Sequence, residues 1–334
     1  MDNTISSIKC INCENQLILK SEFLQCLKCK NKFYKKNGVY EFIKNDLHSN
    51  FAFQWNLFSK TQLDSYNQSS ESKDRLYFQS NMKEKDFQNK KILEVGSGAG
   101  RFTEILKNFN SEIFTVDYSN AIKVNYKNNN QSNILFFQAD IFNLPFFENY
   151  FDIVICYGVI QHTGNNKKAI ESLAKLTSNK NGILLLDIYS NSLKHYNPWI
   201  YLIRFFFKLF NFTDEKKYKI VKTVVSILFP FYLKLFTKLD KFKNNIIIKY
   251  VKYFFNRAPI SVYGINLFLE NKISLDIAKE WSLLDTYDAW MPKFDHPVSY
   301  KKWNKLIREI QHKYNFKKYE VSVSGQGFTS RLCK

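Results

Sequence analysis

Residues 92–100 read Ile-Leu-Glu-Val-Gly-Ser-Gly-Ala-Gly, and this stretch decides the fold of the chain. The short apolar run at 91–95 predicts a buried parallel strand. Gly96 and Gly98 then allow a tight turn and a close approach between backbone and ligand, because glycine has no Cβ atom. The following residues, 101–108, predict a helix. Ligands of open α/β sheets bind beyond the carboxyl ends of the strands, so we expect this turn to hold a cofactor.

The spacing of the glycines indicates which class of cofactor fits. Gly100 comes one residue earlier than the third glycine of Gly-x-Gly-x-x-Gly, the pattern of nicotinamide dinucleotide sites. Glu94 stands two residues before Gly96, where its carboxylate repels a pyrophosphate and suits a cationic ligand with an amino-acid tail. The Gly-Lys-Ser/Thr of a phosphate-binding loop is absent from the sequence. The pattern therefore predicts a cofactor with an adenosine group and no phosphates, S-adenosylmethionine (SAM).

Three further predicted strands, at 112–116, 134–137 and 151–156, end in side chains that suit the same cofactor. Asp117 can accept hydrogen bonds from both ribose hydroxyls. Asp140 can accept from an adenine amino group while Ile141 packs on the ring. The predicted cofactor-binding residues are Glu94, Gly96, Ser97, Gly98, Asp117, Tyr118, Asp140 and Ile141.

The chain resembles the class I SAM-dependent methyltransferases from about residue 50 to its end. The resemblance rests on the segments LEVGSGAGRF, TVDYS, QADIFNLPF and FDIVICYGVIQHT. It implies a Rossmann-like α/β fold with a seven-stranded sheet and one antiparallel strand near the edge. It also implies that Glu94 orders the glycine loop, that Asp117 holds the ribose and that Asp140 contacts adenine. The Asn-Pro-Pro-Tyr motif of relatives that methylate adenine or glutamine amides is replaced by Tyr-Gly-Val-Ile at 157–160.

Four cysteines form two Cys-x-x-Cys pairs, Cys10/Cys13 and Cys26/Cys29, separated by twelve residues. This spacing predicts a zinc ribbon, in which four thiolates surround a tetrahedral ion at about 2.3 Å. Four protein ligands leave no open coordination position, so we expect a structural ion. The alternative is a pair of disulfides. Residues 1–45 resemble the Trm112-type zinc ribbons, which implies a platform for a substrate or partner, or a stabilising appendage.

Basic residues concentrate at 191–260, with 14 Lys/Arg and 3 Asp/Glu in a chain of net charge +19. Predicted helices at 200–210, 220–239 and 246–255 carry aromatic faces. The segment is interpreted as a helical lid over the active site or as a peripheral contact with an anionic membrane. Its longest uncharged run, 223–233, is too short to span a bilayer, which takes about 20 residues.

The expected organisation has four parts. A helix at 299–314 and strands at 316–323 and 328–332 close the sheet. The expected divisions are 1–45 for the zinc ribbon, 46–190 for the SAM-binding core, 191–270 for the helical lid insertion and 271–334 for the C-terminal part of the core.

The predicted catalytic residues follow the fourth strand. His162 is the candidate base, because histidine is the residue type most often used for proton transfer, and Tyr157 is the candidate for positioning the methyl group or the acceptor. The alternative for His162 is a structural hydrogen bond. Weaker candidates are Gln54, Trp55 and Gln62 at the methionine end and Tyr287, Asp288 and His296 in an acceptor pocket, each with an ordinary packing or loop role as the alternative.

The sequence thus favours a SAM-dependent methyltransferase acting on a small molecule, a sugar or a lipid-linked glycan. One alternative is an RNA methyltransferase, which suits the positive charge. Another is a non-catalytic scaffold or membrane-surface protein. No apolar stretch near residue 1 predicts a signal peptide, so we expect a cytoplasmic protein, with peripheral membrane association as the alternative.

Overall fold

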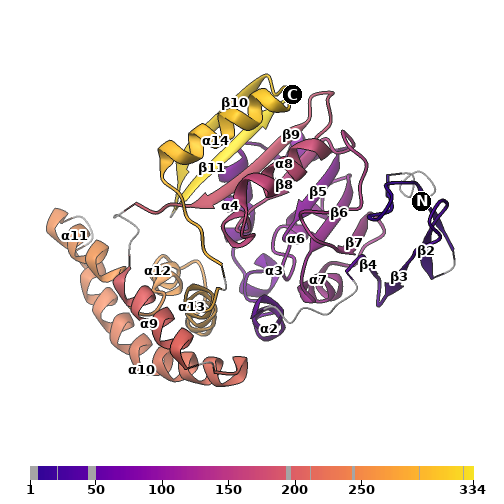
Figure 1. Ribbon diagram of the computed structural model, residues 1–334. Helices are drawn as coiled ribbons and strands as arrows, with labels where there is room; N and C mark the ends of the chain where they lie inside the picture. Colours follow the sequence, from indigo (N-terminus) through magenta and orange to yellow (C-terminus); the bar gives the residue numbers. More distant parts are fainter. Residues whose placement is uncertain are drawn as a thin grey trace. The chain divides into compact units, whose positions relative to one another are not determined.

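The computed structural model describes residues 7–20, 22–43, 50–192, 197–210, 212–242, 245–292, 294–325 and 327–334, without the side chains of 50–52. The chain forms two compact units (Figure 1). The core unit comprises Met1–Ala52, Glu71–Ser192 and Phe294–Lys334. The helical unit comprises Phe53–Ser70 and Leu193–Lys293.

Seven strands of the core unit form the sheet predicted from sequence. Their order is β7-β6-β5-β8-β9-β11-β10, and the first five are parallel. β11 is antiparallel to both of its neighbours. The bounds are β5 Lys91–Val95, β6 Glu112–Asp117, β7 Ile134–Gln138, β8 Ile153–Cys156, β9 Ile183–Tyr189, β10 Lys318–Ser324 and β11 Gly327–Cys333.

The complete sheet has eleven strands, so the expected number of seven is wrong. The additional strands are β1 Leu17–Leu19, β2 Phe23–Cys26, β3 Lys32–Lys36 and β4 Val39–Glu41, all from the cysteine-bearing segment. β4 pairs in parallel with β7, and Phe42 N–H donates to Gln138 O at 2.9 Å. The rings of Phe33 and Phe42 stack 4.5 Å apart, and Phe42 also contacts Phe137. The segment therefore continues the sheet at the β7 edge.

Alternating residues of the central strands enter two different hydrophobic clusters. On β5, Leu93 and Val95 join one cluster and Ile92 joins the other. The first cluster includes residues of α8 (Asn166–Leu176) and α14 (Tyr300–Lys313). The second includes residues of α4 (Glu71–Ser80), α5 (Glu84–Phe87), α6 (Thr103–Leu106) and α7 (Ala121–Asn129). Helices on both faces explain why the strands read as nearly continuous apolar runs.

The helical unit contains α3 (Asp64–Asn67), α9 (Pro198–Leu209), α10 (Asp214–Asp240), α11 (Ile246–Phe255), α12 (Tyr263–Leu269), α13 (Leu275–Trp290) and, from Phe53 onward, α2 (Asn50–Leu57). Its core gathers side chains of α10, α12 and α13, including Val225, Ile265 and Trp281. The unit thus extends past the expected insertion of 191–270, because α13 packs onto α10 and α12. It also includes residues 53–70, which lie within the expected core of 46–190.

The helix α10 extends well beyond the uncharged run at 223–233 on both sides. It continues across Lys222, Pro230 and Lys234 for 27 residues, and by length and composition alone it is able to cross a membrane. The lysines do not interrupt it, because lysine is a good helix former. Val225 and Phe229 nevertheless lie in the core of the helical unit.

Candidate functional site

The glycine turn after β5 adopts backbone conformations that side chains disfavour. Gly96, Gly98 and Gly100 have φ values of +78°, +53° and +94°. A Cβ atom on Gly96 would lie 2.1 Å from Val159 Cγ2, so the loop after β8 packs directly on this turn. Gly96 N–H donates to Val116 O at 2.7 Å, which fixes the turn to the neighbouring strand β6.

Asparagines of α7 hold the far side of the turn. Asn128 Nδ2 donates to Ala99 O at 2.9 Å, and Asn129 Nδ2 donates to Gly100 O at 3.0 Å. The sequence prediction missed both residues. Asparagine is only a moderate helix former, so the run of asparagines at 128–130 was a usable signal.

Asp117, at the end of β6, is bonded to the glycine turn itself. Its Oδ2 accepts from Gly98 N–H at 2.8 Å, and its Oδ1 accepts from the N–H and the hydroxyl of Ser119, both at 2.8 Å. A carboxylate oxygen offers two lone pairs, so Oδ2 retains one for a ligand hydroxyl. Burial raises the pKa of Asp117, and the bonds from Ser119 and Gly98 offset part of that rise.

Glu94 is buried beneath the turn. Its Oε2 accepts from the hydroxyls of Thr103 at 2.5 Å and Thr115 at 3.3 Å. Within the described part of the chain, its Oε1 has no hydrogen-bond partner. Burial raises the pKa of Glu94 to about 7. A cationic group beside Oε1 would favour the ionised carboxylate.

The predicted adenine-binding residues follow β7. Asp140 is half-buried, and its Oδ1 accepts from Phe142 N–H at 2.9 Å. Ile141 is partly buried against the first cluster, and Tyr118 is 39% exposed. Burial, with a contribution from Asp140, raises the pKa of Tyr118. Asp117 on β6 is paired in register with Gln138, the last residue of β7. The carboxyl ends of the two strands therefore lie at the same edge of the sheet, and Asp140 follows β7 by two residues.

The loop after β8 rests on a buried acid that the sequence prediction missed. Asp187 Oδ1 accepts from Gly158 N–H at 2.5 Å, and its Oδ2 lies 3.2 Å from Arg75 Nη2. Burial raises the pKa of Asp187, and Arg75 offsets part of the rise. Asp187 lies at the carboxyl end of a parallel strand after three buried leucines, which is the same signal that identified Asp117.

Tyr157 is buried beside Asp187, and its hydroxyl has no hydrogen-bond partner among the residues that the structure describes. Burial is the main cause that raises the pKa of Tyr157 well above its usual value, and the negative charge of Asp187 raises it further. The phenol therefore stays protonated near neutral pH and is a hydrogen-bond donor, which suits a positioning role and not that of a base.

His162 lies in the short helix η1 (Ile160–His162) directly after the β8 loop. Its Nδ1 lies 2.8 Å from Phe294 O. A carbonyl oxygen only accepts, so Nδ1 is the donor and Nε2 of the neutral ring carries the lone pair. The structural hydrogen bond that is the alternative role for His162 is thus present.

The weaker candidates are divided between the two units. Gln54, Trp55 and Gln62 belong to the helical unit, where Gln54 Nε2 donates to Asp288 Oδ1 at 3.2 Å. Tyr287 is fully buried in the core of that unit, beside Phe53. His296 belongs to the core unit, and its N–H donates to Gln161 O at 2.9 Å. The ordinary surface loop that is the alternative for Tyr287 does not describe its position, because Tyr287 lies buried on the helix α13.

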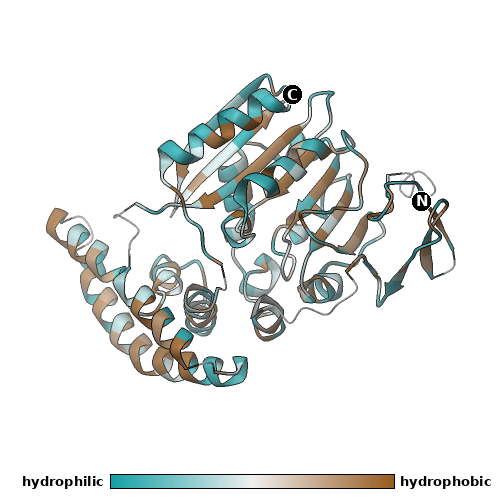
Figure 2. Cartoon of the chain, viewed as in Figure 1, coloured by the Kyte–Doolittle hydropathy of each residue, from teal (hydrophilic) through white to brown (hydrophobic). Residues whose placement is uncertain are grey.

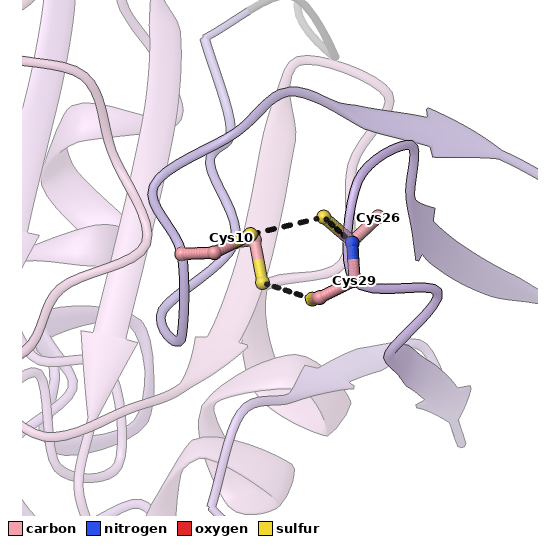
Figure 3. A group of neighbouring side chains, drawn as sticks. Cys10, Cys26 and Cys29 are labelled. Atoms are coloured by element: carbon pink, nitrogen blue, oxygen red, sulfur yellow. Dashed lines mark hydrogen bonds between the residues drawn. The ribbon is translucent and has the colours of Figure 1, made fainter.

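The four predicted metal ligands come together in the core unit. The Sγ atoms of Cys10, Cys13, Cys26 and Cys29 all lie within 4.8 Å of one another. Figure 3 labels three of them, Cys10, Cys26 and Cys29. The pairs Cys10/Cys29 and Cys13/Cys26 are 3.5 and 3.4 Å apart, well beyond the roughly 2.05 Å of a disulfide. Tetrahedral zinc with Zn–S bonds of about 2.3 Å places sulfurs about 3.8 Å apart, so the donor set fits that ion.

The two cysteine turns have the same local geometry. Glu14 and Lys30 each follow the second cysteine of their pair and have φ values of +57° and +61°. Glu14 N–H donates to Cys10 O at 2.8 Å, and Lys30 N–H donates to Cys26 O at 3.2 Å. Cys156 and Cys333 lie outside this cluster.

The polar groups at the strand ends fit SAM. Three buried atoms, Glu94 Oε1, Ser97 Oγ and Tyr157 Oη, lack partners in the described structure, and their residues lie at or just after the ends of β5 and β8. Asp117 keeps one lone pair for a hydroxyl, and the turn has no room for a Cβ at Gly96. The residues therefore match a ligand with donors and a positive charge.

Residues 93–186 match the family model described as a methyltransferase domain. An uncharacterized protein of Methanocaldococcus jannaschii is 31% identical over 112 residues, which are 33% of this chain and 47% of the relative. The chain thus spans about half the length of the curated relative that it matches. The family match covers residues 93–186, from β5 to β9, and indicates a methyltransferase domain in this part of the chain.

Two solved structures are also similar. The complex of the Haloferax volcanii Trm112 methyltransferase activator with a proposed methyltransferase is 13% identical, with a TM-score of 0.38, over 48% of this chain and 68% of that one. Phosphoethanolamine N-methyltransferase 1 of Haemonchus contortus, with phosphoethanolamine and S-adenosylhomocysteine, is 21% identical, with a TM-score of 0.34, over 44% of this chain and 33% of that one.

Proposed function

We propose that the protein transfers a methyl group from SAM to a small molecule, a sugar or a lipid-linked glycan. The observation that carries this proposal is the bond between Gly98 N–H and Asp117 Oδ2, which joins the glycine turn to the end of β6. It sets the turn, the ribose-binding carboxylate and the unpaired Glu94 Oε1 at one sheet edge. Glu94 and Ser97 would hold the amino-acid end of SAM, Asp117 the ribose, and Asp140 with Ile141 the adenine.

Bound SAM supplies an electrophilic methyl group on a positively charged sulfur. The protein must hold the acceptor atom in line with that methyl group, and such positioning can contribute about 7–11 kcal/mol. Tyr157, which stays protonated, donates a hydrogen bond and orients the reacting groups. The Arg75–Asp187 pair keeps the Gly158 backbone, and with it Tyr157, in place.

His162 is the group that would take the proton from a hydroxyl acceptor. Nδ1 is occupied by Phe294 O, so the proton moves to Nε2. Loss of such a base lowers the rate by about 10²–10⁴-fold. We expect His162→Asn to lower kcat in that range and to leave SAM affinity unchanged. An unchanged kcat would restrict His162 to its hydrogen bond with Phe294 O.

The four cysteines are proposed to bind one structural zinc ion. All four positions around the metal would be filled by thiolates, so the ion would take no part in methyl transfer. Its role would be to stabilise β1–β4 at the edge of the sheet.

Calorimetry with SAM tests the proposed function. We expect micromolar affinity for the full chain and no measurable binding by Asp117→Ala. The matched control is Asp152→Ala, because Asp152 Oδ2 likewise accepts a backbone N–H, from Lys91 at 2.9 Å, at the opposite edge of the sheet. Equal SAM affinity in wild type and Asp117→Ala would overturn the assignment.

A further inference from the structure

The helix α9 has apolar residues on two faces, and only one of them is used by the fold. Ile200, Ile203 and Phe207 follow helical spacing and pack against the core of the helical unit. A second set points outward, at 49–60% exposure: Trp199, Leu202, Phe205, Phe206 and Leu209. A helix of a globular protein needs one apolar stripe to pack on its core, so the outer set calls for another explanation.

The helix α11 repeats this arrangement. Phe255 packs on the core of the helical unit, while Ile247, Tyr250 and Phe254 are 66–69% exposed. Among the described residues, 27 large apolar side chains are exposed, and 15 of them lie between residues 197 and 255. Figure 2 shows the apolar colour along α9, α10 and α11, interrupted by hydrophilic residues. Exposed apolar side chains gathered in this way mark a binding surface.

The charge of the same segment identifies the partner. Residues 191–260 hold 14 Lys/Arg and 3 Asp/Glu. A second copy of the chain would bring an equal positive charge against this surface, and the repulsion disfavours a second copy as the partner. Nucleic acids stack on aromatic rings, whereas Leu202, Leu209 and Ile247 offer no ring to a base. An anionic phospholipid surface satisfies both the aliphatic and the basic residues, with aromatic rings at the level of the headgroups.

The position of α10 argues for a helix that lies on the membrane and does not cross it. Val221, Val225, Phe229 and Phe236 are buried in the core of the helical unit. Insertion of α10 would expose the partners of these residues on α12 and α13, including Ile265 and Trp281. By contrast, α9 and α11 have no buried residue in the described structure.

We propose that the outer faces of α9 and α11 dock in the headgroup region of an anionic bilayer. These docking faces are Trp199, Leu202, Phe205, Phe206 and Leu209 on α9, and Ile247, Tyr250 and Phe254 on α11. The proposal deepens the proposed function, because it places the enzyme where a lipid-linked acceptor resides. Binding itself does not depend on methyl transfer.

Vesicle flotation of the full chain tests the docking faces. Vesicles of phosphatidylcholine with about 30% phosphatidylglycerol should carry the protein, and pure phosphatidylcholine vesicles should carry much less, because each lysine near an anionic surface strengthens binding about fivefold. Added salt should release the protein. Absence of flotation with both vesicles would overturn the proposal and leave the lid interpretation for these helices.

Surface variants assign the binding to specific residues. The combination Phe205→Ser, Phe206→Ser, Tyr250→Ser and Phe254→Ser should lower the bound fraction at least tenfold. The control combines Phe78→Ser and Val323→Ser, which alter side chains of similar exposure in the core unit. Equal loss in both would overturn the assignment. If the first variant fails to fold, the double variant Lys208→Glu with Lys249→Glu tests α9 and α11 through their charge. Unchanged flotation of this double variant would also overturn the assignment.

Four additional measurements separate docking on the membrane surface from the other arrangements. Trp199 fluorescence should shift to the blue with anionic vesicles, and Trp199→Phe should lose that shift while the protein still floats. Alkaline carbonate should release the protein from vesicles; retention would show that α10 crosses the bilayer. Binding to bulk transfer RNA, lost with the same Phe and Tyr changes, would show a nucleic-acid surface. Asp117→Ala should float normally, so failure of SAM binding and failure of docking are distinguishable.

Discussion

The guanidinium of Arg75 holds the buried carboxylate of Asp187, with Nη2 3.2 Å from Oδ2. The other oxygen of Asp187 accepts from Gly158 N–H. Arg75 on α4 thereby fixes the loop that follows β8. That loop carries Tyr157 and packs on Gly96 through Val159. The ion pair thus connects α4 with the loop that packs on the glycine turn.

Replacing Arg75 should loosen this loop. Arg75→Ala leaves the Asp187 carboxylate buried with fewer donors, which costs about 1–3 kcal/mol. The ion pair is partly exposed on the arginine side, so we expect the lower half of that range. Urea unfolding measures the change. Lys73→Ala on the same helix, at an exposed position, is the control and should stay within about 0.5 kcal/mol of wild type. A loss no larger than that of the control would contradict the role of the pair.

A Cβ at Gly96 should damage the cofactor turn by collision. Gly96→Ala brings a methyl group 2.1 Å from Val159 Cγ2, in addition to the strain of φ +78°. Gly164 has nearly the same φ, +77°, with no atom within 4 Å of the added Cβ, so Gly164→Ala isolates the strain, about 1 kcal/mol. We expect SAM binding to be lost in Gly96→Ala only. Calorimetry of the two variants with SAM measures this difference. Similar SAM affinities would mean that Val159 moves aside and that the added methyl group does not disturb the turn.

Glu94 should make the protein less stable as the pH rises. Its pKa is about 7 in the folded protein and lies near 4.5 when unfolded, so the folded state binds the extra proton between these values. Stability falls through this window and levels off above about pH 7, a total change of about 3 kcal/mol.

Glu94→Gln removes this titration. The stability of the variant relative to wild type should rise by about 2 kcal/mol between about pH 5 and about pH 8. Denaturant unfolding at several pH values gives the difference directly. Glu112→Gln, at the exposed start of β6, is the control and should show a constant difference. The same constant difference for Glu94→Gln would mean that the carboxyl is not protonated in the folded protein.

The purified protein should contain one zinc ion per chain. Cys26→Ser should lose the ion and lower the melting temperature, because Cys26 is buried on β2 and β2 is part of the sheet. Cys333→Ser, outside the cluster, should retain zinc. Elemental analysis and calorimetric melting with and without a chelator provide the measurements. A full zinc content in Cys26→Ser would remove this residue from the ligand set.

The sequence predicted the parallel strands closely. The run at 91–95 matches β5 at both ends, because buried strands read as uninterrupted apolar segments that end at a glycine or an acid. The helices at 246–255 and 299–314 were also close to α11 and α14. The pairing of β4 with β7 was not predictable, since a three-residue strand carries too little pattern to specify a partner.

Residues within one loop were easier to identify than residues joined across the fold. Glu94, Gly96 and Asp117 belong to short sequence patterns that predict a ligand-binding site. Arg75 lies 112 positions before Asp187, and neither residue's neighbours in the chain indicate the other. The hydrogen bond from His162 Nδ1 to Phe294 O, which sets the tautomer of the histidine, spans 132 positions. Ion pairs and tautomers depend on distances between side chains, and these exist only after folding.

The sequence by itself determined the glycine turn, the acids at the strand ends and the four cysteines, because each depends on backbone conformation or ligand chemistry over a few neighbouring residues. Only the tertiary structure decided which face of α9 packs inward and which is left exposed. Both faces of this helix carry large apolar side chains, so their presence alone does not indicate which face packs inward. The apolar core formed by α10, α12 and α13 determines which face packs inward, because it covers Ile203 and leaves Phe206 in solvent.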